Sequence, residues 1–205
     1  NRVGADPGRR FLPRPKGLPA GWPAAVYPAF DPDGSLTYFQ ARLVEPPEGR
    51  CKYDNPASRW AANPRVAWTQ PISAKTPPGS CLVVTEGIAD ALVSVQAGYR
   101  SVGVLGSTYP DRDVARRITQ GAIQIGVQRV VVCFDADVAG RTGSSRLVDL
   151  LNGCGVEDVV EVMPPAGLDL SEWASTGNAV AEAFRAAATV DPGTKDASVR
   201  SLGLE

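Results

Sequence analysis

Three acidic residues in two short motifs have the types and spacing needed for metal-dependent chemistry. Glu86 directly follows the apolar run LVVT, and Asp135 and Asp137 directly follow the apolar run RVVVCF. Residues two apart on an extended chain point to the same side, so both aspartates can face one crevice. If the two runs are neighbouring parallel strands, their ends lie about 5 Å apart. The three carboxylates are then expected to converge at one edge of a sheet.

Carboxylates that converge repel one another, and one or more should take up a proton unless a cation neutralises them. Ligand sets made only of oxygen favour a hard ion, Mg²⁺ or Mn²⁺. A small number of protein ligands leaves coordination positions for water and phosphate oxygens, as phosphoryl transfer requires. The alternative is a set of solvated acids in which Asp135 and Asp137 only cap a helix. The occurrence of both motifs in one predicted sheet favours the metal site.

The composition excludes several kinds of active site. Histidine is absent from the 205 residues, so Ser-His-Asp catalysis, Cys-His catalysis and histidine-ligated zinc are excluded. The four cysteines, at positions 51, 81, 133 and 154, are too far apart for a CxxC zinc motif. Cys81 and Cys133 lie in apolar runs and are predicted to be buried. Without expected disulfides, a visible secretory leader or an apolar run of about 18 residues, the chain is predicted to be cytoplasmic.

Charge is distributed unevenly along the chain. Residues 1–80 carry a net charge of +5 and residues 81–205 a net charge of −6, which together give −1. A basic part beside an acidic part is typical of an enzyme that contacts phosphates with one and holds cations with the other. An asymmetry of this size can also arise by chance, so it supports the prediction only weakly.

The pattern of apolar residues predicts an α/β fold. Runs at 25–30 and 36–43, joined by DPDGS, predict a β-hairpin, and the Pro-rich stretches after it predict loops. Beyond residue 80, strands are expected at 82–85, 101–106, 129–134 and 158–163, and helices at 88–97, 110–125, 138–151 and 178–188. Alternation of this kind predicts a parallel sheet with helices on both faces, whose ligands bind beyond the carboxyl ends of the strands.

We therefore expect three parts. Residues 1–78 would form a small basic subdomain around the hairpin, residues 79–190 the α/β domain, and residues 191–205 a flexible tail.

The motifs resemble those of the TOPRIM domain, and among TOPRIM proteins they are most similar to DnaG-type DNA primases. The segments that carry the resemblance are TEGIADALVSVQAG, VGVLGSTYPD, CFDADVAGRTGSSR and PPAGLDLSEW. Upstream, AFDPDGSLTYFQARL and CKYDNP resemble the primase hairpin that ends in arginine and the K-Y-x-N-P loop after it. The resemblance runs from about Tyr27 to Gly177 and implies a TOPRIM sheet beside a basic subdomain.

The resemblance implies roles for individual residues. Glu86, Asp135 and Asp137 would be catalytic and metal-binding, and Asp169 and Asp90 would be further metal ligands. Where the primases have a second late aspartate, this chain has Ser171, so one ligand is absent or is supplied by Glu172. Nucleic acid and nucleotide would contact Arg42, Lys52, Tyr53, Asn55 and Arg141. The alternative for the basic residues is that they are ordinary solvated cations.

A further lysine of the primase pattern has no clear counterpart. Arg59, Arg65 and Lys75 are the candidates for it. The stretch before the first α/β strand is also short and Pro-rich, which favours a phage, plasmid or mobile-element enzyme over a cellular primase.

The implied function is synthesis of short RNA primers on a single-stranded DNA template during DNA replication, from NTPs, with Mg²⁺ or Mn²⁺ as cofactor. The chain contains neither a Cys/His zinc module nor a GxxxxGK[ST] phosphate loop. We therefore expect it to be the core of a longer primase or primase–helicase. A replicative helicase and a zinc-binding module would then be found elsewhere in that protein or in trans.

Other functions remain open. A TOPRIM nuclease would use the same acids but does not need the basic KYDNP-bearing part. A non-catalytic DNA-binding scaffold would not need all three acids. A topoisomerase would need gate domains for which this chain has no room, and a dinucleotide-binding domain would need a GxGxxG motif after its first strand.

Overall fold

The structure is a computed structural model, and it describes residues 3–6, 22–46, 48–49, 51–71, 81–106, 109–177 and 179–189. Several predictions fall outside these residues: most of the irregular N-terminal segment, the linker at 72–80 with Lys75, Asn178 as a helix cap, and the C-terminal tail.

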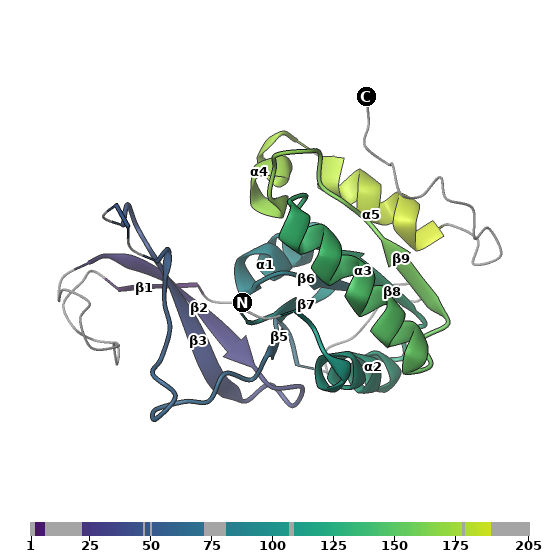
Figure 1. Ribbon diagram of the computed structural model, residues 1–205, viewed down its shortest axis with the longest axis horizontal. Coiled ribbons are helices and arrows are strands. Elements are labelled where there is room, and N and C mark those ends of the chain that lie inside the picture. The colour runs from purple at the N-terminus through teal and green to yellow at the C-terminus, as the bar shows by residue number, and fades with distance from the viewer. Residues whose placement is uncertain are drawn as a thin grey trace.

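The described strands form one mixed sheet with the order β4-β3-β2-β5-β7-β6-β8-β9, and β1 pairs with β2. The strands of the N-terminal part are β1 (Gly4–Asp6), β2 (Ala24–Phe30), β3 (Leu36–Leu43), β4 (Tyr53–Asp54) and β5 (Val66–Trp68). Those of the following part are β6 (Leu82–Thr85), β7 (Arg100–Val104), β8 (Arg129–Cys133) and β9 (Asp158–Glu161). Figure 1 shows β1, β2 and β3 extending to one side of the helix-covered part.

The predicted hairpin is confirmed. β2 and β3 are antiparallel, with Ala24 opposite Leu43 and Pro28 opposite Phe39. The turn between them places Gly34 at φ 90°, where glycine is favoured. The loop predicted after the hairpin is partly wrong, because it contains the short strands β4 and β5.

Four parallel strands, β7, β6, β8 and β9, form one end of the sheet. β6 pairs with β7 on one side and with β8 on the other, and β8 pairs with β9, all in parallel. In register, Thr85 lies between Gly103 and Cys133, so the carboxyl ends of these strands meet at one edge. All residues of β6, β7 and β8 are buried, as expected for strands covered on both faces. Cys81 and Cys133 are buried and free, as predicted.

Helices cover both faces of this sheet, as predicted. They are α1 (Ile88–Gln96), α2 (Arg112–Ile125), α3 (Val138–Gly153), α4 (Leu170–Ser175) and α5 (Ala179–Thr189). Apolar residues of α2 and α3 join one core cluster, and residues of α1, α4 and α5 join the cluster on the other face. α4 was not predicted. Within the described residues, no helix combines the length and the apolar character needed to cross a membrane.

The strand β5 joins the two parts of the chain in one sheet. It is antiparallel to β7, with Val66 opposite Val104, and its Trp68 lies opposite Phe30 of β2. The hairpin therefore has a fixed position relative to the parallel strands. The predicted boundary at 78/79 lies outside the described residues and stays a prediction.

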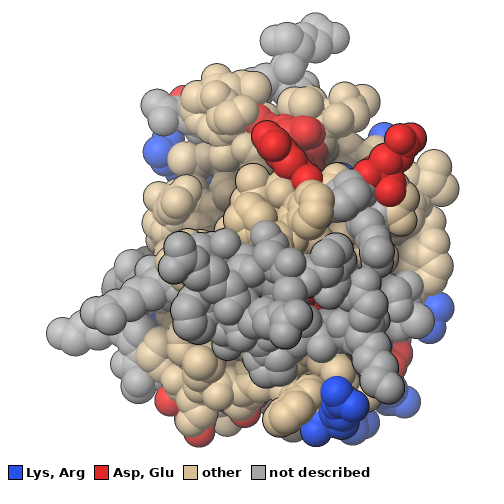
Figure 2. All heavy atoms as spheres, turned by 90° about the vertical axis from the view of Figure 1, so that its left-hand side faces the viewer, with Lys and Arg blue, Asp and Glu red and all other residues tan. Residues whose placement is uncertain are grey.

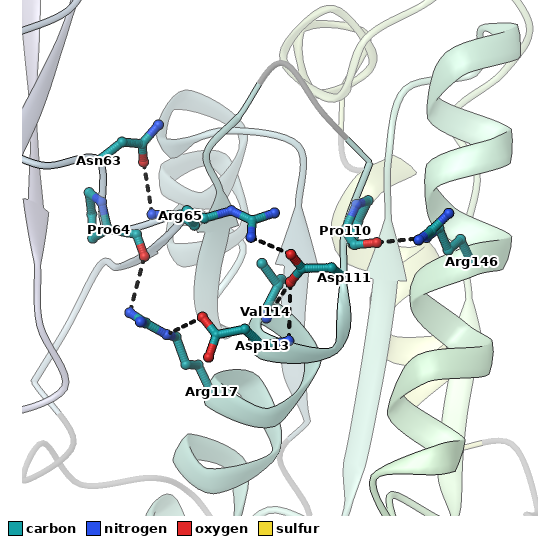
Figure 3. A network of polar contacts seen from close by, with 9 residues as sticks. All are labelled: Asn63, Pro64, Arg65, Pro110, Asp111, Asp113, Val114, Arg117 and Arg146. Atoms are coloured by element: carbon teal, nitrogen blue, oxygen red, sulfur yellow. Dashed lines mark hydrogen bonds and ion pairs between the residues drawn. The ribbon is translucent and has the colours of Figure 1, made fainter. Parts of the chain in front are cut away.

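Polar contacts reinforce this junction on the α2 side (Figure 3). Arg65 pairs with Asp111, the N-cap of α2, at 2.5 Å, and this hydrogen bond is the main cause that lowers the pKa of the Asp111 carboxyl. Arg117 pairs with Asp113 at 2.9 Å and also donates to the carbonyl of Pro64 at 3.3 Å. The loop before β5 is thus held against the first two turns of α2.

The packing of Trp68 against α2 gives a test of this arrangement. A Cβ atom added at Gly121 would lie 2.0 Å from the Trp68 ring, which is only 2% exposed. Gly121→Ala should therefore lower the free energy of unfolding by about 1–3 kcal/mol, despite the better helix propensity of alanine. Urea denaturation measures the change. Gly153→Ala in α3, where an added Cβ meets no atom within 4 Å, is the matched control and should be neutral or stabilising. Equal effects of the two substitutions would contradict the packing.

Candidate active site

Five carboxylates from four parts of the chain lie at the carboxyl edge of the parallel strands. Glu86 follows β6, Asp135 and Asp137 follow β8, Asp90 lies in the first turn of α1, and Asp169 is the N-cap of α4. We call these five residues the acidic cluster. The predicted adjacency of the two motif-bearing strands is confirmed, because β6 and β8 pair directly.

Asp135 shows how closely these charges interact. Its pKa is raised from the ordinary value of 3.8 to about 7, first by burial and then by the charges of Glu86, Asp90, Asp169 and Asp137. Every other member of the cluster thus acts on Asp135, which places that carboxyl at its electrostatic centre.

Glu86 and Asp90 are affected in the same direction. Burial raises the pKa of Glu86, a hydrogen bond from the backbone amide of Asp135 partly offsets this, and the charges of Asp137 and Asp90 raise it further. Burial also raises the pKa of Asp90, which the charge of Asp169 raises further. The cluster therefore carries negative charge that is costly to hold without a cation.

Ser171 and Arg42 act in the opposite direction on Asp90. The Ser171 hydroxyl donates to Oδ1 of Asp90 at 2.9 Å, and this bond lowers the pKa of Asp90, as does the charge of Arg42 on β3. The Arg42 side chain of the N-terminal part thus lies close enough to the cluster to interact with its charges.

Two members of the cluster also cap helices, as the alternative interpretation of the sequence predicted for Asp137. Oδ1 of Asp137 accepts from the amide of Gly140 at 2.7 Å, and Oδ1 of Asp169 accepts from the amide of Glu172 at 2.7 Å. Each of these caps uses one carboxylate oxygen, so the other oxygen remains for a second partner. The N-cap of α3 is Asp137 and not Asp135, so helix capping does not account for an aspartate at position 135.

Two glycines permit the close packing beside the acids. A Cβ atom at Gly140 would lie 2.2 Å from the carbonyl oxygen of Asp135, and one at Gly103 would lie 2.5 Å from the carbonyl oxygen of Gly87. Any larger residue would displace the backbone next to Asp135 or Glu86.

The donor chemistry of the cluster fits a hard divalent cation. All five side chains offer carboxylate oxygen. The pKa values of Glu86, Asp90 and Asp135 are raised first by burial and then by the neighbouring carboxylates, and a divalent ion would offset both effects. Among the described residues, however, no three His, Cys, Asp or Glu side chains are arranged to enclose a metal ion. The carboxylates converge, but they do not form a finished coordination shell.

Basic and aromatic groups of the N-terminal part face the cluster. Arg42 and Tyr53 lie opposite each other on β3 and β4. Burial raises the pKa of Tyr53, and the charges of Arg42, Asp90 and Asp169 also act on it. Figure 2 shows acidic side chains gathered in the upper part of the face that carries the N-terminal strands.

The remaining predicted binding residues differ in their surroundings. Lys52 is exposed next to Tyr53, whereas Oδ1 of Asn55 is buried and has no hydrogen-bond partner within the described part of the chain. Arg141 is exposed and donates to the carbonyl of Ala136 at 2.8 Å, so its guanidinium lies against the loop between Asp135 and Asp137.

The two described candidates for the missing lysine have different partners. Arg65 is engaged by Asp111, and Arg59 lies over the ring of Trp60 with 5.7 Å between its Cζ and the ring centroid. Glu172, considered as a replacement ligand, instead accepts from the amide of Asp169 through Oε2 at 3.0 Å. The contact of Ser171 with Asp90 was missed, although the D-x-x-E capping pattern at 169–172 could have predicted the short helix that presents it.

Known proteins resemble this chain in both sequence and fold. Residues 80–160 match the model of the Toprim domain. A DNA primase of Clostridium acetobutylicum is 26% identical over 149 residues, which are 72% of this chain and 24% of the relative. A DNA primase of Enterococcus faecalis is 27% identical over 177 residues, which are 82% of this chain and 27% of the relative. The chain thus spans about a quarter of the length of these relatives.

Solved structures share the fold. A DNA primase domain from Pseudomonas aeruginosa matches with a TM-score of 0.60 and 20% identity, covering 89% of this chain and 56% of that one. A DnaG primase catalytic domain bound to single-stranded DNA matches with a TM-score of 0.60 and 21% identity, covering 80% and 52%. Residues 80–160 therefore match the Toprim domain, and the predicted resemblance of the chain to the catalytic core of DnaG-type DNA primases is confirmed.

Proposed function

We propose that this chain is the catalytic core of a DNA primase, which joins ribonucleotides into short primers on single-stranded DNA. The observation that carries the proposal is the meeting of the acidic cluster with Arg42 and Tyr53 of the N-terminal strands. The cluster can hold cations, and the N-terminal groups can hold phosphates and bases. The curated relatives named as DNA primases and the related structure with bound single-stranded DNA support this assignment.

In this proposal Glu86, Asp135 and Asp137 hold Mg²⁺ or Mn²⁺, with Asp90 and Asp169 as further ligands. When bound, such ions lower the pKa of the attacking 3′-hydroxyl and neutralise charge on the departing pyrophosphate. The absence of histidine leaves carboxylates as the acidic and basic groups of the site.

The basic side chains bind and orient the other reactants. Arg42 and Lys52 contact phosphates of the nucleotide or the template, and Arg141 contacts phosphate from the α3 side. Tyr53 and Asn55 contact the nucleotide, and the ring of Tyr53 can stack with a base.

Ser171 takes the place of a sixth carboxylate. Its hydrogen bond fixes the orientation of Asp90, and Glu172 is already used in the capping box of α4. We therefore propose that the cluster works with five carboxylates, of which Asp90 is positioned by Ser171.

The acidic cluster alone would also serve a metal-dependent nuclease. The groups of the N-terminal part that reach the cluster favour the primase, because cleavage does not require them. A zinc-binding module and a replicative helicase would supply initiation and unwinding, as parts of a longer protein or in trans.

Primer synthesis is tested with single-stranded template, labelled NTPs and Mn²⁺ or Mg²⁺, with products separated on a gel. The protein should yield short RNA, and Asp135→Asn should reduce the yield at least about 100-fold, because it removes the central carboxylate. Asp149→Asn, an exposed acid far along α3, is the matched control and should retain activity. Degradation of the template would identify a nuclease. If both the template and the nucleotides stay unchanged, the chain is a non-catalytic scaffold.

The burial of Asp135 and the charges around it predict an unusual stability effect. Because the pKa of Asp135 rises from 3.8 to about 7 on folding, its contribution to stability is complete below about pH 4 and is lost as the pH rises through about 7. In metal-free buffer at pH 8, Asp135→Asn should therefore stabilise the fold by about 1 kcal/mol, after allowance for solvent screening. Mg²⁺ should raise the Tm of the original protein at pH 8 more than at pH 5. Destabilisation by Asp135→Asn together with no Mg²⁺ effect would be contrary to the account.

The positioning role of Ser171 is tested by metal titration. Ser171→Ala should weaken Mn²⁺ binding by about tenfold, because Asp90 loses the hydrogen bond that orients it. Ser175→Ala is the control on the same helix, since its exposed hydroxyl donates to the carbonyl of Glu172. If both variants bind Mn²⁺ as the original protein does, Ser171 has no positioning role.

A further inference from the structure

We propose that Trp60, together with Arg59, is a stacking site for an unpaired nucleic-acid base next to the acidic cluster. The inference rests on the proposed function and adds a binding residue that lies outside the sequence motifs.

Trp60 is largely exposed to solvent, and its ring takes no part in the hydrophobic core. Its exposed fraction is 64%, whereas Trp68 and Trp173 are buried at 2% and 3%. Leaving a large aromatic ring in water forgoes the stabilisation that burial would give. An exposed tryptophan that the core does not use is therefore available to a ligand.

Arg59 places a positive charge next to the Trp60 ring, which favours an anionic ligand. Its guanidinium lies over one face of the Trp60 ring, at 5.7 Å from the centroid. The opposite face can then stack with a base, while the cation lies where the phosphate of that nucleotide can reach it. Within the described chain, no carboxylate pairs with Arg59, and residues 55–64 contain no acidic residue that would repel a phosphate.

The turn that carries Trp60 is anchored beside the acidic cluster. The amide of Trp60 donates to the carbonyl of Ala57 at 2.8 Å, which closes the turn. Ala61 packs against an apolar cluster that contains Ile88 and Leu105. Ile88 lies two residues after Glu86, and Leu105 follows the carboxyl end of β7. The stacking site is therefore held close to the edge where the carboxylates converge.

The surroundings of the ring favour a base over a protein partner. Its neighbours along the turn, Ser58, Arg59, Ala62 and Asn63, are exposed and small or polar. A stable protein–protein interface buries roughly 1,000 Å² or more in total, which is far more than one ring and one cation supply. One ring beside one cation matches the size and charge of a single nucleotide, and stacking tolerates any base sequence.

The test measures, by fluorescence anisotropy, how tightly the full chain binds a labelled single-stranded oligothymidylate. Trp60→Leu should weaken binding by about 5- to 100-fold, which corresponds to the loss of one stacked base. Trp60→Phe should lose less than Trp60→Leu, because a smaller ring still stacks. Ile123→Ala, which alters another exposed apolar residue on α2, is the control and should bind as the original protein does.

An abasic oligonucleotide of the same length separates stacking from phosphate attraction. It should bind the original protein and Trp60→Leu equally. The inference is overturned if Trp60→Leu binds oligothymidylate like the original protein, or if it loses affinity for both strands to the same extent. The proposed function still stands without this stacking site if Arg42→Ala binds the oligonucleotide more weakly and the original protein synthesises primers. No binding of any strand by the original protein would overturn both.

Discussion

Mutual repulsion among carboxylates is the constraint around which the rest of the structure is organised. Side chains from the ends of β6 and β8 and from α1 and α4 are brought to one edge of a sheet whose central strands are wholly buried. The sheet can hold these charges together because its hydrophobic packing on both faces fixes the strand ends. The pKa of Asp135 is raised to about 7, first by burial and then by the neighbouring carboxylates, and this shift expresses the cost of holding the charges there. Glycine at 103 and 140 allows the approach of the backbone that the arrangement requires.

The N-terminal strands gain their role through the same sheet. Since β5 pairs with both β2 and β7, the hairpin belongs to the same sheet as the acidic edge. Arg42 can then act on Asp90, and the turn with Trp60 can pack near Ile88.

Much of this arrangement was predictable from the sequence, because the strands and helices after residue 80 are strongly periodic and the acids follow strand ends directly. What was missed depends on contacts between distant residues. β5 has three residues and forms only by pairing with strands far away in the chain. The hydrogen bond between Ser171 and Asp90 joins residues 81 positions apart. α4, with six residues, is too short to show a helical period, although its capping box was visible.

Anomalous diffraction from crystals soaked with Mn²⁺ tests the central claim most directly, because it locates the ion without relying on activity. The account predicts an anomalous peak between Glu86 and the Asp135/Asp137 pair, within bonding distance of oxygens from both strand ends. Full occupancy at another surface with no peak at this edge would contradict it. A crystal structure in which Glu86 and Asp135 each pair with a different basic side chain, and not with Mn²⁺, would also contradict it.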